Sequence, residues 1–250
     1  MPAEYILESI SQPEPRCTAI VLAAGSGSRM KSAVRKQFLS LQGYPLVWYS
    51  LKCFQESPLI DDIILVTGAE SLDYCQKEII DKYGFTKVRK VTPGGAERYD
   101  SVYAGLLECR QTEMVLIHDS ARPFVTEEMI RDGLAGAALT GAAVIGVPSK
   151  DTVKMTDQDG FVNMTPPRSS VWIIHTPQIF RASLIRDAHE KLRMQGMEGI
   201  TDDAMVVEKA FGTKVRLVMG SYRNIKVTTP EDLVLAESLM GAGSDLNIVQ

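Results

Sequence analysis

Residues 18–30 read TAIVLAAGSGSRM, an apolar run that leads directly into a glycine-rich loop. Four more short runs rich in β-branched residues follow along the chain: DIILVT (62–67), KVRKV (87–91), MVLIHD (114–119) and AAVIGVP (142–148). Segments with helical periodicity separate these runs, and continuous apolar strands that alternate with helices are typical of a parallel sheet covered on both faces. The sequence therefore predicts an α/β protein with a Rossmann-like three-layer fold and a mostly parallel central sheet.

Local signals indicate where several helices begin. Residues 46–54 follow Gly43 and Pro45, and Thr126 is followed by two glutamates that suit a first helical turn. Thr229 and Pro230 precede a similar acidic turn and the run LVLAESL. We expect helices at these three places.

The pattern changes between Lys150 and Ile174, where polar and apolar residues alternate around Asp159-Gly160. Alternation around an Asp-Gly pair indicates a β-hairpin, and this one is too long to be a simple connection. We expect residues 149–174 to form a protruding β-hairpin arm of the kind that serves as an interaction arm or an active-site lid. The arm is predicted to be an insertion within a single domain, 16–245, which follows a loose leader, 1–15.

Composition limits the classes of function. The chain has 250 residues and a formal net charge of −4, so it lacks the basic field that draws proteins onto nucleic acid. It holds no run of about eighteen apolar residues, and its first fifteen residues do not resemble a signal peptide or an anchor. The cysteines, at 17, 53, 75 and 109, are scattered and read as reduced thiols of a cytoplasmic protein.

The loop after the first strand has the features of a phosphate-binding loop. Glycines at 25 and 27 allow the backbone N–H groups to approach an anion, although two glycines alone are equally consistent with a plain turn. Arg29 and Lys36 favour the phosphate-binding interpretation. Arg29 and Met30 fit neither a dinucleotide fingerprint nor a P-loop.

Asp119 closes the run MVLIHD, at the carboxyl end of a predicted strand, where open α/β sheets bind their ligands. A single aspartate there is often only a turn or cap residue, but Arg122 follows three positions later. Mg²⁺ in nucleotide sites prefers one or two carboxylates besides phosphate oxygens and water, so a sparse set of acids is what such a site needs.

The loop LAAGSGSRM, followed by KQF, resembles the signature of sugar-phosphate nucleotidyltransferases. Further segments are similar, in order and spacing, to the 2-C-methyl-D-erythritol 4-phosphate cytidylyltransferases: GGAERYDSV (94–102), HDSARPFV (118–125), DTVK (151–154), HTPQIF (175–180), TDDA (201–204) and NIKVTTPEDL (224–233). The match runs from about Thr18 to Leu239. It implies transfer of a cytidylyl group from CTP to the sugar-alcohol phosphate with release of pyrophosphate, in non-mevalonate isoprenoid precursor synthesis, with Mg²⁺ or another divalent cation. The resemblance places Asp119 by the metal and the substrate, where it either binds the metal, directly or through water, or contacts the hydroxyls of the acceptor.

The resemblance also implies roles for individual residues. Four are assigned to catalysis: Arg29, Lys36, Arg168 and Lys226. The nucleotide-binding set comprises Ala23, Ala24, Gly25, Gly27, Gly94, Gly95, Ser101, Asp119 and Ala121. The acceptor-binding set comprises Asp119, Arg122, Thr152, Arg168, Thr201, Asp202 and Lys226.

Simpler interpretations exist for several of these residues. Lys226, in a strand-like NIKVT segment, reads by itself as a surface lysine, and helix capping explains Thr201 and Asp202. The resemblance implies that the arm crosses to a second subunit of a homodimer, where Thr152 and Arg168 reach the partner's acceptor phosphate.

Three departures from the family pattern lie near the acceptor side: Arg35 where proline is frequent, Ser120 where alanine is frequent, and TDDAM at 201–205. Ribitol-5-phosphate cytidylyltransferases, which share the fold and mechanism, are the nearest alternative, although they more often carry Ala-Gly-Gly in the loop. A non-catalytic nucleotide-binding module is a further alternative. Retention of Arg29, Lys36 and Lys226 argues against it, because a pure binder has less need of cations aimed at a transition state.

Overall fold

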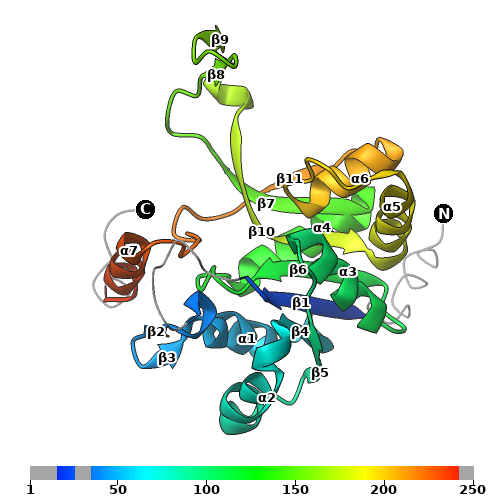
Figure 1. The fold of residues 1–250 in the computed structure, drawn as a ribbon, viewed down its shortest axis with the longest axis vertical. Helices are drawn as coiled ribbons and strands as arrows, with labels where there is room; N and C mark the ends of the chain where they lie inside the picture. The colour runs from blue at the N-terminus through cyan, green and yellow to red at the C-terminus, as the bar shows by residue number, and fades with distance from the viewer. Residues whose placement is uncertain (1–15, 26–34, 242–250) are drawn as a thin grey trace, which may run out of the picture.

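The computed structural model describes residues 16–25 and 35–241. The predicted leader, 1–15, lies outside the described residues, as do 26–34 and 242–250. In the described part, a seven-stranded sheet has the order β11-β7-β10-β6-β1-β4-β5 (Figure 1). Its strands are β1 (Cys17–Ala23), β4 (Asp62–Thr67), β5 (Val88–Pro93), β6 (Met114–Asp119), β7 (Ala142–Pro148), β10 (Trp172–Arg181) and β11 (Arg216–Met219).

The mostly parallel sheet predicted from the sequence is confirmed. β1 pairs in parallel with both β4 and β6, β4 with β5, and β7 with β11. β10 is the exception, since it runs antiparallel to its two neighbours, β6 and β7. The sequence patterns had not indicated β10 or β11 as sheet strands.

Helices cover both faces of the sheet, which gives three layers. Alternate residues of β1 serve the two sides: Ala19 and Val21 belong to one apolar cluster and Ile20 to the other. The first cluster includes α1 (Leu46–Glu56), α4 (Glu127–Thr140) and the π-helical η5 (Cys75–Asp81). The second includes α3 (Arg98–Glu108), α5 (Ala182–Gln195) and α6 (Asp203–Phe211).

Short elements and the last helix complete the described chain. They are η3 (Lys36–Phe38), β2 (Ser40–Leu41), β3 (Tyr44–Pro45), η4 (Ala69–Ser71), α2 (Leu72–Tyr74), β8 (Met155–Thr156), β9 (Val162–Met164), η6 (Arg168–Ser170) and α7 (Pro230–Gly241). The helices expected at 46–54, after Thr126 and after Thr229 are all present. The Thr126 hydroxyl caps α4 by accepting a hydrogen bond from the Met129 N–H.

The segment between β7 and β10 leaves the sheet. β8 and β9 pair only with each other, antiparallel, and Gly160 takes a left-handed backbone at the turn between them (φ 86°). Figure 1 shows this pair standing away from the body of the molecule. Where the segment departs and returns, Pro148 pairs with Trp172.

No described helix is long and apolar enough to cross a membrane.

Candidate functional site

The carboxyl ends of β1 and β6 form the floor of a pocket of about 360 Å³. The two strands lie side by side, with Leu22 in register with Asp119. The pocket is lined by Leu22, Ala23, Ala24, Gly25, Lys36, Gln37, Gly95, Ala96, Glu97, Arg98, Ser101, Asp119, Ser120, Ala121 and Lys226. Most of the nucleotide-binding residues expected from the sequence are therefore together, at the edge of the sheet where open α/β folds bind ligands.

The start of the loop after β1, the predicted phosphate-binding loop, is fixed by a buried glutamine. Gln37 Nε2 donates a hydrogen bond of 2.5 Å to the carbonyl oxygen of Ala23, which ends β1. Lys36 lies beside Gly25 at the pocket wall. The expected site residues Gly27 and Arg29 lie outside the described residues.

The loop after β5 packs tightly against the start of α3. The Gly95 N–H donates to Ser101 Oγ at 3.2 Å, and the same hydroxyl donates to the Glu97 carbonyl at 3.3 Å. A Cβ atom on Gly94 would lie 2.5 Å from Ser101 Oγ and 2.7 Å from the Ala24 Cβ. Only glycine therefore allows the two loops to approach this closely.

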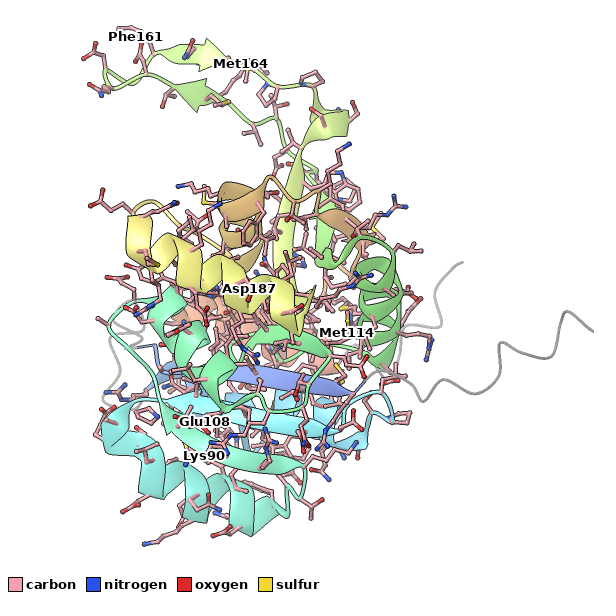
Figure 2. All side chains as sticks on the ribbon, turned by 90° about the vertical axis from the view of Figure 1, so that its right-hand side faces the viewer. Lys90, Glu108, Met114, Phe161, Met164 and Asp187 are labelled. Atoms are coloured by element: carbon pink, nitrogen blue, oxygen red, sulfur yellow. The ribbon has the colours of Figure 1, made fainter. Side chains whose placement is uncertain are left out.

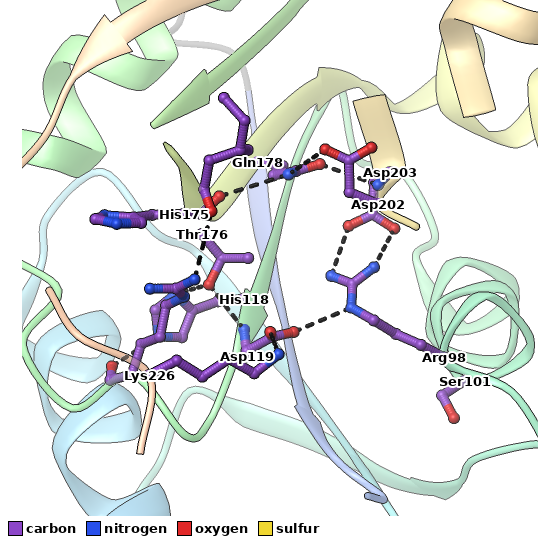
Figure 3. A network of polar contacts seen from close by, with 12 residues as sticks. Arg98, Ser101, His118, Asp119, His175, Thr176, Gln178, Asp202, Asp203 and Lys226 are labelled. Atoms are coloured by element: carbon purple, nitrogen blue, oxygen red, sulfur yellow. Dashed lines mark hydrogen bonds and ion pairs between the residues drawn. The ribbon is translucent and has the colours of Figure 1, made fainter. Parts of the chain in front are cut away.

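A charged centre occupies the back of the pocket (Figure 3). Lys226 Nζ lies 2.6 Å from Asp119 Oδ2, and Arg98 Nε lies 3.1 Å from Asp119 Oδ1. The two terminal nitrogens of Arg98 form a fork on the buried carboxylate of Asp203, at 2.8 and 2.9 Å. Burial would raise the pKa of the Asp119 carboxyl, but the charges of Arg98 and Lys226 outweigh it and hold that pKa well below its ordinary range.

A second pocket, of about 300 Å³, adjoins the first and shares Arg98, Asp119 and Lys226 with it. Its other lining residues are Arg122, Ile174, His175, Thr176, Gln178, Thr201 and Asp202. The expected acceptor-binding residues Arg122, Thr201 and Asp202 therefore meet there.

Arg122 is the unusual cation of this second pocket. It is 9% exposed, and burial lowers the pKa of its guanidinium. Its terminal nitrogens donate to backbone carbonyls, of Asn224 at 2.7 Å and of Ile174 at 3.4 Å. Within the described ranges it forms no ion pair with a carboxylate, and its Nε has no hydrogen-bond partner. A buried cation whose hydrogen bonds go to carbonyls still attracts an anionic ligand, although the charge of Asp119 already stabilises it in part.

Gln178 fixes the start of α6. Its Oε1 accepts hydrogen bonds from the N–H groups of Asp203 and Ala204, at 3.0 and 2.9 Å, and its Nε2 donates to Asp202 Oδ2 at 3.0 Å. Asp202 in turn caps the helix by accepting from the Met205 N–H at 2.9 Å. Asp203 is thereby placed opposite Arg98.

One predicted strand is absent from the structure, and two of the predicted site residues lie apart from both pockets. Residues 224–228 are not a strand: Arg122 Nη1 donates to the Asn224 carbonyl, and the Val227 N–H donates to Ala121, so these groups serve the turn after β6 and not a ladder. Thr152 and Arg168 are exposed and line neither pocket; Arg168 Nη1 donates to the Lys150 carbonyl at 3.1 Å.

Arg98, Thr176 and Gln178 are the most informative of the site residues that the sequence does not predict. All three lie in sequence motifs that were recognised, but nothing local assigns them a role. Arg98 pairs with a residue 105 positions away, so its partner is visible only in the fold.

Among the described residues, no group of three or more His, Cys, Asp or Glu side chains is arranged to hold a metal ion. Glu97 is used as the N-cap of α3, in a capping box with Asp100. Asp119 is then the carboxylate of the first pocket that does not cap a helix. A single carboxylate suits a metal ion that arrives bound to a phosphate ligand, and it does not suit a site built from protein groups alone.

Comparisons with known proteins agree with this geometry. The family model described as IspD, 2-C-methyl-D-erythritol 4-phosphate cytidylyltransferase, matches residues 17–242. A curated protein of that description from Lachnoclostridium phytofermentans is 46% identical over 230 residues, which cover 92% of this chain and 98% of the relative. One from Clostridium kluyveri is 45% identical over 221 residues, covering 88% and 95%.

Solved structures give the same result. A crystal structure of 4-diphosphocytidyl-2C-methyl-D-erythritol synthase from Anaerococcus prevotii superposes with a TM-score of 0.81 at 35% identity, covering 91% of this chain and 97% of that one. The 2-C-methyl-D-erythritol 4-phosphate cytidylyltransferase of Thermus thermophilus gives a TM-score of 0.71 at 31% identity, covering 89% and 98%.

Proposed function

This chain belongs to the 2-C-methyl-D-erythritol 4-phosphate cytidylyltransferase family, and from that premise we propose that the two joined pockets hold CTP and the sugar-alcohol phosphate, respectively. The protein transfers a cytidylyl group from CTP to 2-C-methyl-D-erythritol 4-phosphate and releases pyrophosphate, a step in isoprenoid precursor synthesis. The observation that carries the assignment of the pockets is their shared wall of Arg98, Asp119 and Lys226. Two ligands that fill the pockets meet there.

The chemistry needs cations and no general base. A phosphate monoester has a second pKa of about 6, so the acceptor is largely dianionic at neutral pH and attacks the α-phosphorus of CTP directly. Charge then accumulates on the transferring and leaving oxygens. In this proposal Lys36 and Arg29 stabilise the triphosphate, and Lys226 stabilises the point where the two phosphates meet.

The nucleotide-side residues divide between backbone and side-chain roles. Ala23, Ala24 and Gly25 offer loop backbone to the phosphates, as would Gly27, while Gly94 and Gly95 allow the base to approach. Ser101 holds the base loop in shape through its hydrogen bonds with Gly95 and Glu97. Ala121 and Asp119 close the pocket on the β6 side.

Magnesium has one protein ligand in this proposal, the carboxylate of Asp119, directly or through water. When bound, the ion neutralises charge on the triphosphate. Asp119 stays ionised without it, because Arg98 and Lys226 hold the pKa of its carboxyl low.

On the acceptor side, Arg122 attracts the anionic ligand into the second pocket, and Thr201 and Asp202 present polar groups to its hydroxyls. We also propose that the chain is a homodimer joined through the 149–174 arm, with Thr152 and Arg168 completing the partner's acceptor pocket. Support comes from the apolar tip of the arm: Phe161 and Met164 are 73% and 50% exposed, and Figure 2 shows both at its far end. All four cysteines are free, which supports a cytoplasmic location.

The function is tested by incubating the purified protein with Mg-CTP and either 2-C-methyl-D-erythritol 4-phosphate or ribitol 5-phosphate, and measuring pyrophosphate release. Release is expected with the first acceptor and is expected to stop with EDTA. Lys226→Met should lower turnover by about 10²- to 10³-fold, the usual effect of removing one such donor. Lys214→Met, at an exposed lysine outside both pockets, is the matched control. Release only with ribitol 5-phosphate, or equal turnover of the two variants, would contradict the proposal.

The shared site is tested by mixing two inactive variants, Lys36→Ala and Arg168→Ala. If Arg168 serves the neighbouring subunit, mixed dimers contain one intact centre and recover activity. Light scattering at the concentrations of the assay gives the mass of the assembly, and co-purification of differently tagged chains verifies that subunits have exchanged. A monomer by mass, or exchange without recovery, would show that Arg168 does not act across subunits.

A further inference from the structure

A buried chain of hydrogen bonds holds the backbone of Asp119, and thereby the position from which its carboxylate extends. Asp119 ends β6, and its backbone N–H donates to Thr176 Oγ1 at 3.1 Å. The same hydroxyl lies 3.1 Å from Nδ1 of His118, whose Nε2 lies 3.1 Å from the carbonyl oxygen of Arg122 (Figure 3). His118 is 0% exposed and Thr176 4% exposed, so water does not compete for these bonds.

The partners fix the direction of each bond. A carbonyl oxygen only accepts, so Nε2 of His118 must carry the ring proton that it donates to Arg122. In a neutral ring Nδ1 is then an acceptor, so the Thr176 hydroxyl donates to it and uses its own lone pair to accept from the Asp119 N–H. A ring protonated at both nitrogens would leave the Thr176 hydroxyl, which already accepts from the Asp119 N–H, with no acceptor for its own proton among these contacts.

The chain spans both ends of the turn that carries the site. His118 holds the carbonyl of Arg122 at one end, and through Thr176 it holds the N–H of Asp119 at the other. The Arg122 N–H also donates to the Asp119 carbonyl at 3.0 Å, so the turn is tight. β10 supplies no backbone acceptor for Asp119, because its ladder with β6 ends at the pair Gln178–Ile117.

We infer that His118 is a positioning residue for the transfer reaction, acting through Thr176 to fix the placement of Asp119 between the two pockets. The inference rests on the proposed function only in the role it gives to Asp119. His118 itself faces the other side of the sheet, where its ring packs edge-on against Phe54 with centroids 5.3 Å apart. It therefore has no direct route to either ligand.

A purely structural histidine would fill space beside Phe54 without a defined tautomer, and ¹⁵N NMR of the rings separates the two cases. The chain has three histidines, so single substitutions at 175 and 189 assign the spectrum. In the native protein at pH 7 the His118 ring should show a protonated Nε2 and an unprotonated Nδ1. Thr176→Val should disturb the Nδ1 resonance and Thr176→Ser should not. A ring that exchanges between tautomers in the native protein would overturn the inference, whether or not the enzyme is active.

Two amides of different length then test which end of the chain matters. Asparagine at 118 places its amide near the position of Nδ1 and keeps the link to Thr176, whereas glutamine places it near Nε2 and loses that link. We expect His118→Gln to lower turnover about tenfold or more, as small misplacements of a reacting group do, and His118→Asn to restore most of it. Thermal unfolding of both variants verifies that they are equally folded. Equal turnover of the two amides would overturn the inference.

A double-mutant cycle completes the test and remains informative if a position-118 variant fails to fold. If Thr176 acts through Asp119, then Thr176→Val should lower turnover in the native background and have little further effect in an Asp119→Asn background. CTP affinity is measured in parallel, so that the four proteins of the cycle can be compared by affinity if turnover falls below detection. Additive effects would show that Thr176 acts independently of Asp119 and would overturn the inference.

Discussion

Replacing Arg98 with leucine is expected to destabilise the fold by about 3–5 kcal/mol, because the change leaves a buried carboxylate without its counter-charge. The side chain of Asp203 is 1% exposed and receives both terminal nitrogens of Arg98. Asp119 is affected less, since Lys226 stays 2.6 Å away. In a chain of this size each kcal/mol moves Tm by roughly 2–4 °C, so Tm should fall by roughly 6–20 °C.

The cause is isolated by a cycle with Asp203→Asn, measured by thermal unfolding at one protomer concentration. An asparagine carries no charge to bury, so Arg98→Leu combined with Asp203→Asn should be more stable than Arg98→Leu alone. Arg193→Leu is the matched control, because it breaks a bond of similar length to Asp100 on the same helix, where the two side chains are 36% and 24% exposed. An exposed pair contributes about 0–1 kcal/mol, so this control should shift Tm little.

The pH dependence provides an independent check. Burial raises the pKa of the Asp203 carboxyl, and the charge of Arg98 opposes that rise, so removing Arg98 should raise the pKa further. A carboxyl with a raised folded pKa binds its proton more tightly in the native state, so its burial costs least in acid and more as pH increases. The gap between Arg98→Leu and the native protein should therefore be smaller at pH 5 than at pH 8. A gap independent of pH, together with no rescue by Asp203→Asn, would refute this account.

Two further predictions concern other parts of the molecule. His189 is 0% exposed, neither of its ring nitrogens has a hydrogen-bond partner among the described residues, and its pKa is lowered to about 4, chiefly by burial. The free energy of unfolding of the native protein should therefore fall as pH drops from about 6.5 towards 4. Measured by urea unfolding at pH 7 and 4.5, His189→Phe should make this fall smaller by about 2–3 kcal/mol. An equal fall in the native protein and the variant would contradict this. Gly94→Ala, which places a Cβ atom 2.5 Å from Ser101 Oγ, should raise KM for CTP about tenfold or more. Gly68→Ala is the control, because its Cβ would meet only the flexible ends of the Glu70 and Arg35 side chains; equal KM values would exclude the steric argument.

The elements with strong local patterns could be predicted from the sequence. Continuous β-branched runs located β1, β4, β6 and β7, because strands buried on both faces need apolar residues at every position. β10 was missed since its polar residues, His175 to Gln178, interrupt the apolar run in order to serve the site. Local patterning fails where function overrides it.

The residues of the candidate site likewise divide into those with a local sequence signal and those without one. Loop and strand-end residues such as Gly25 and Asp119 could be named from their local context. The pairing of Arg98 with Asp203 could not, because it depends on how two helices from distant parts of the chain lie across the sheet. The sequence around Lys226 predicts a strand that the structure does not contain, since apolar alternation does not reveal that the backbone hydrogen bonds there go to a turn.

Pro148 and Trp172 form the last pair between β7 and β10 on the side of the β8–β9 segment. The residues between them therefore form an appendix whose own strands, β8 and β9, pair only with each other and not with the main sheet. Changing the number of residues in that appendix leaves the register of β10, and hence the side of the sheet that Thr176 faces, unaltered. Insertions and deletions at the turn between β8 and β9, around Gly160, leave the strand ends of the sheet in place, whereas changes next to Thr152 or Arg168 would move residues that the proposed dimer uses. The same independence makes the turn at Gly160 a suitable site for grafting a short foreign sequence onto the folded protomer.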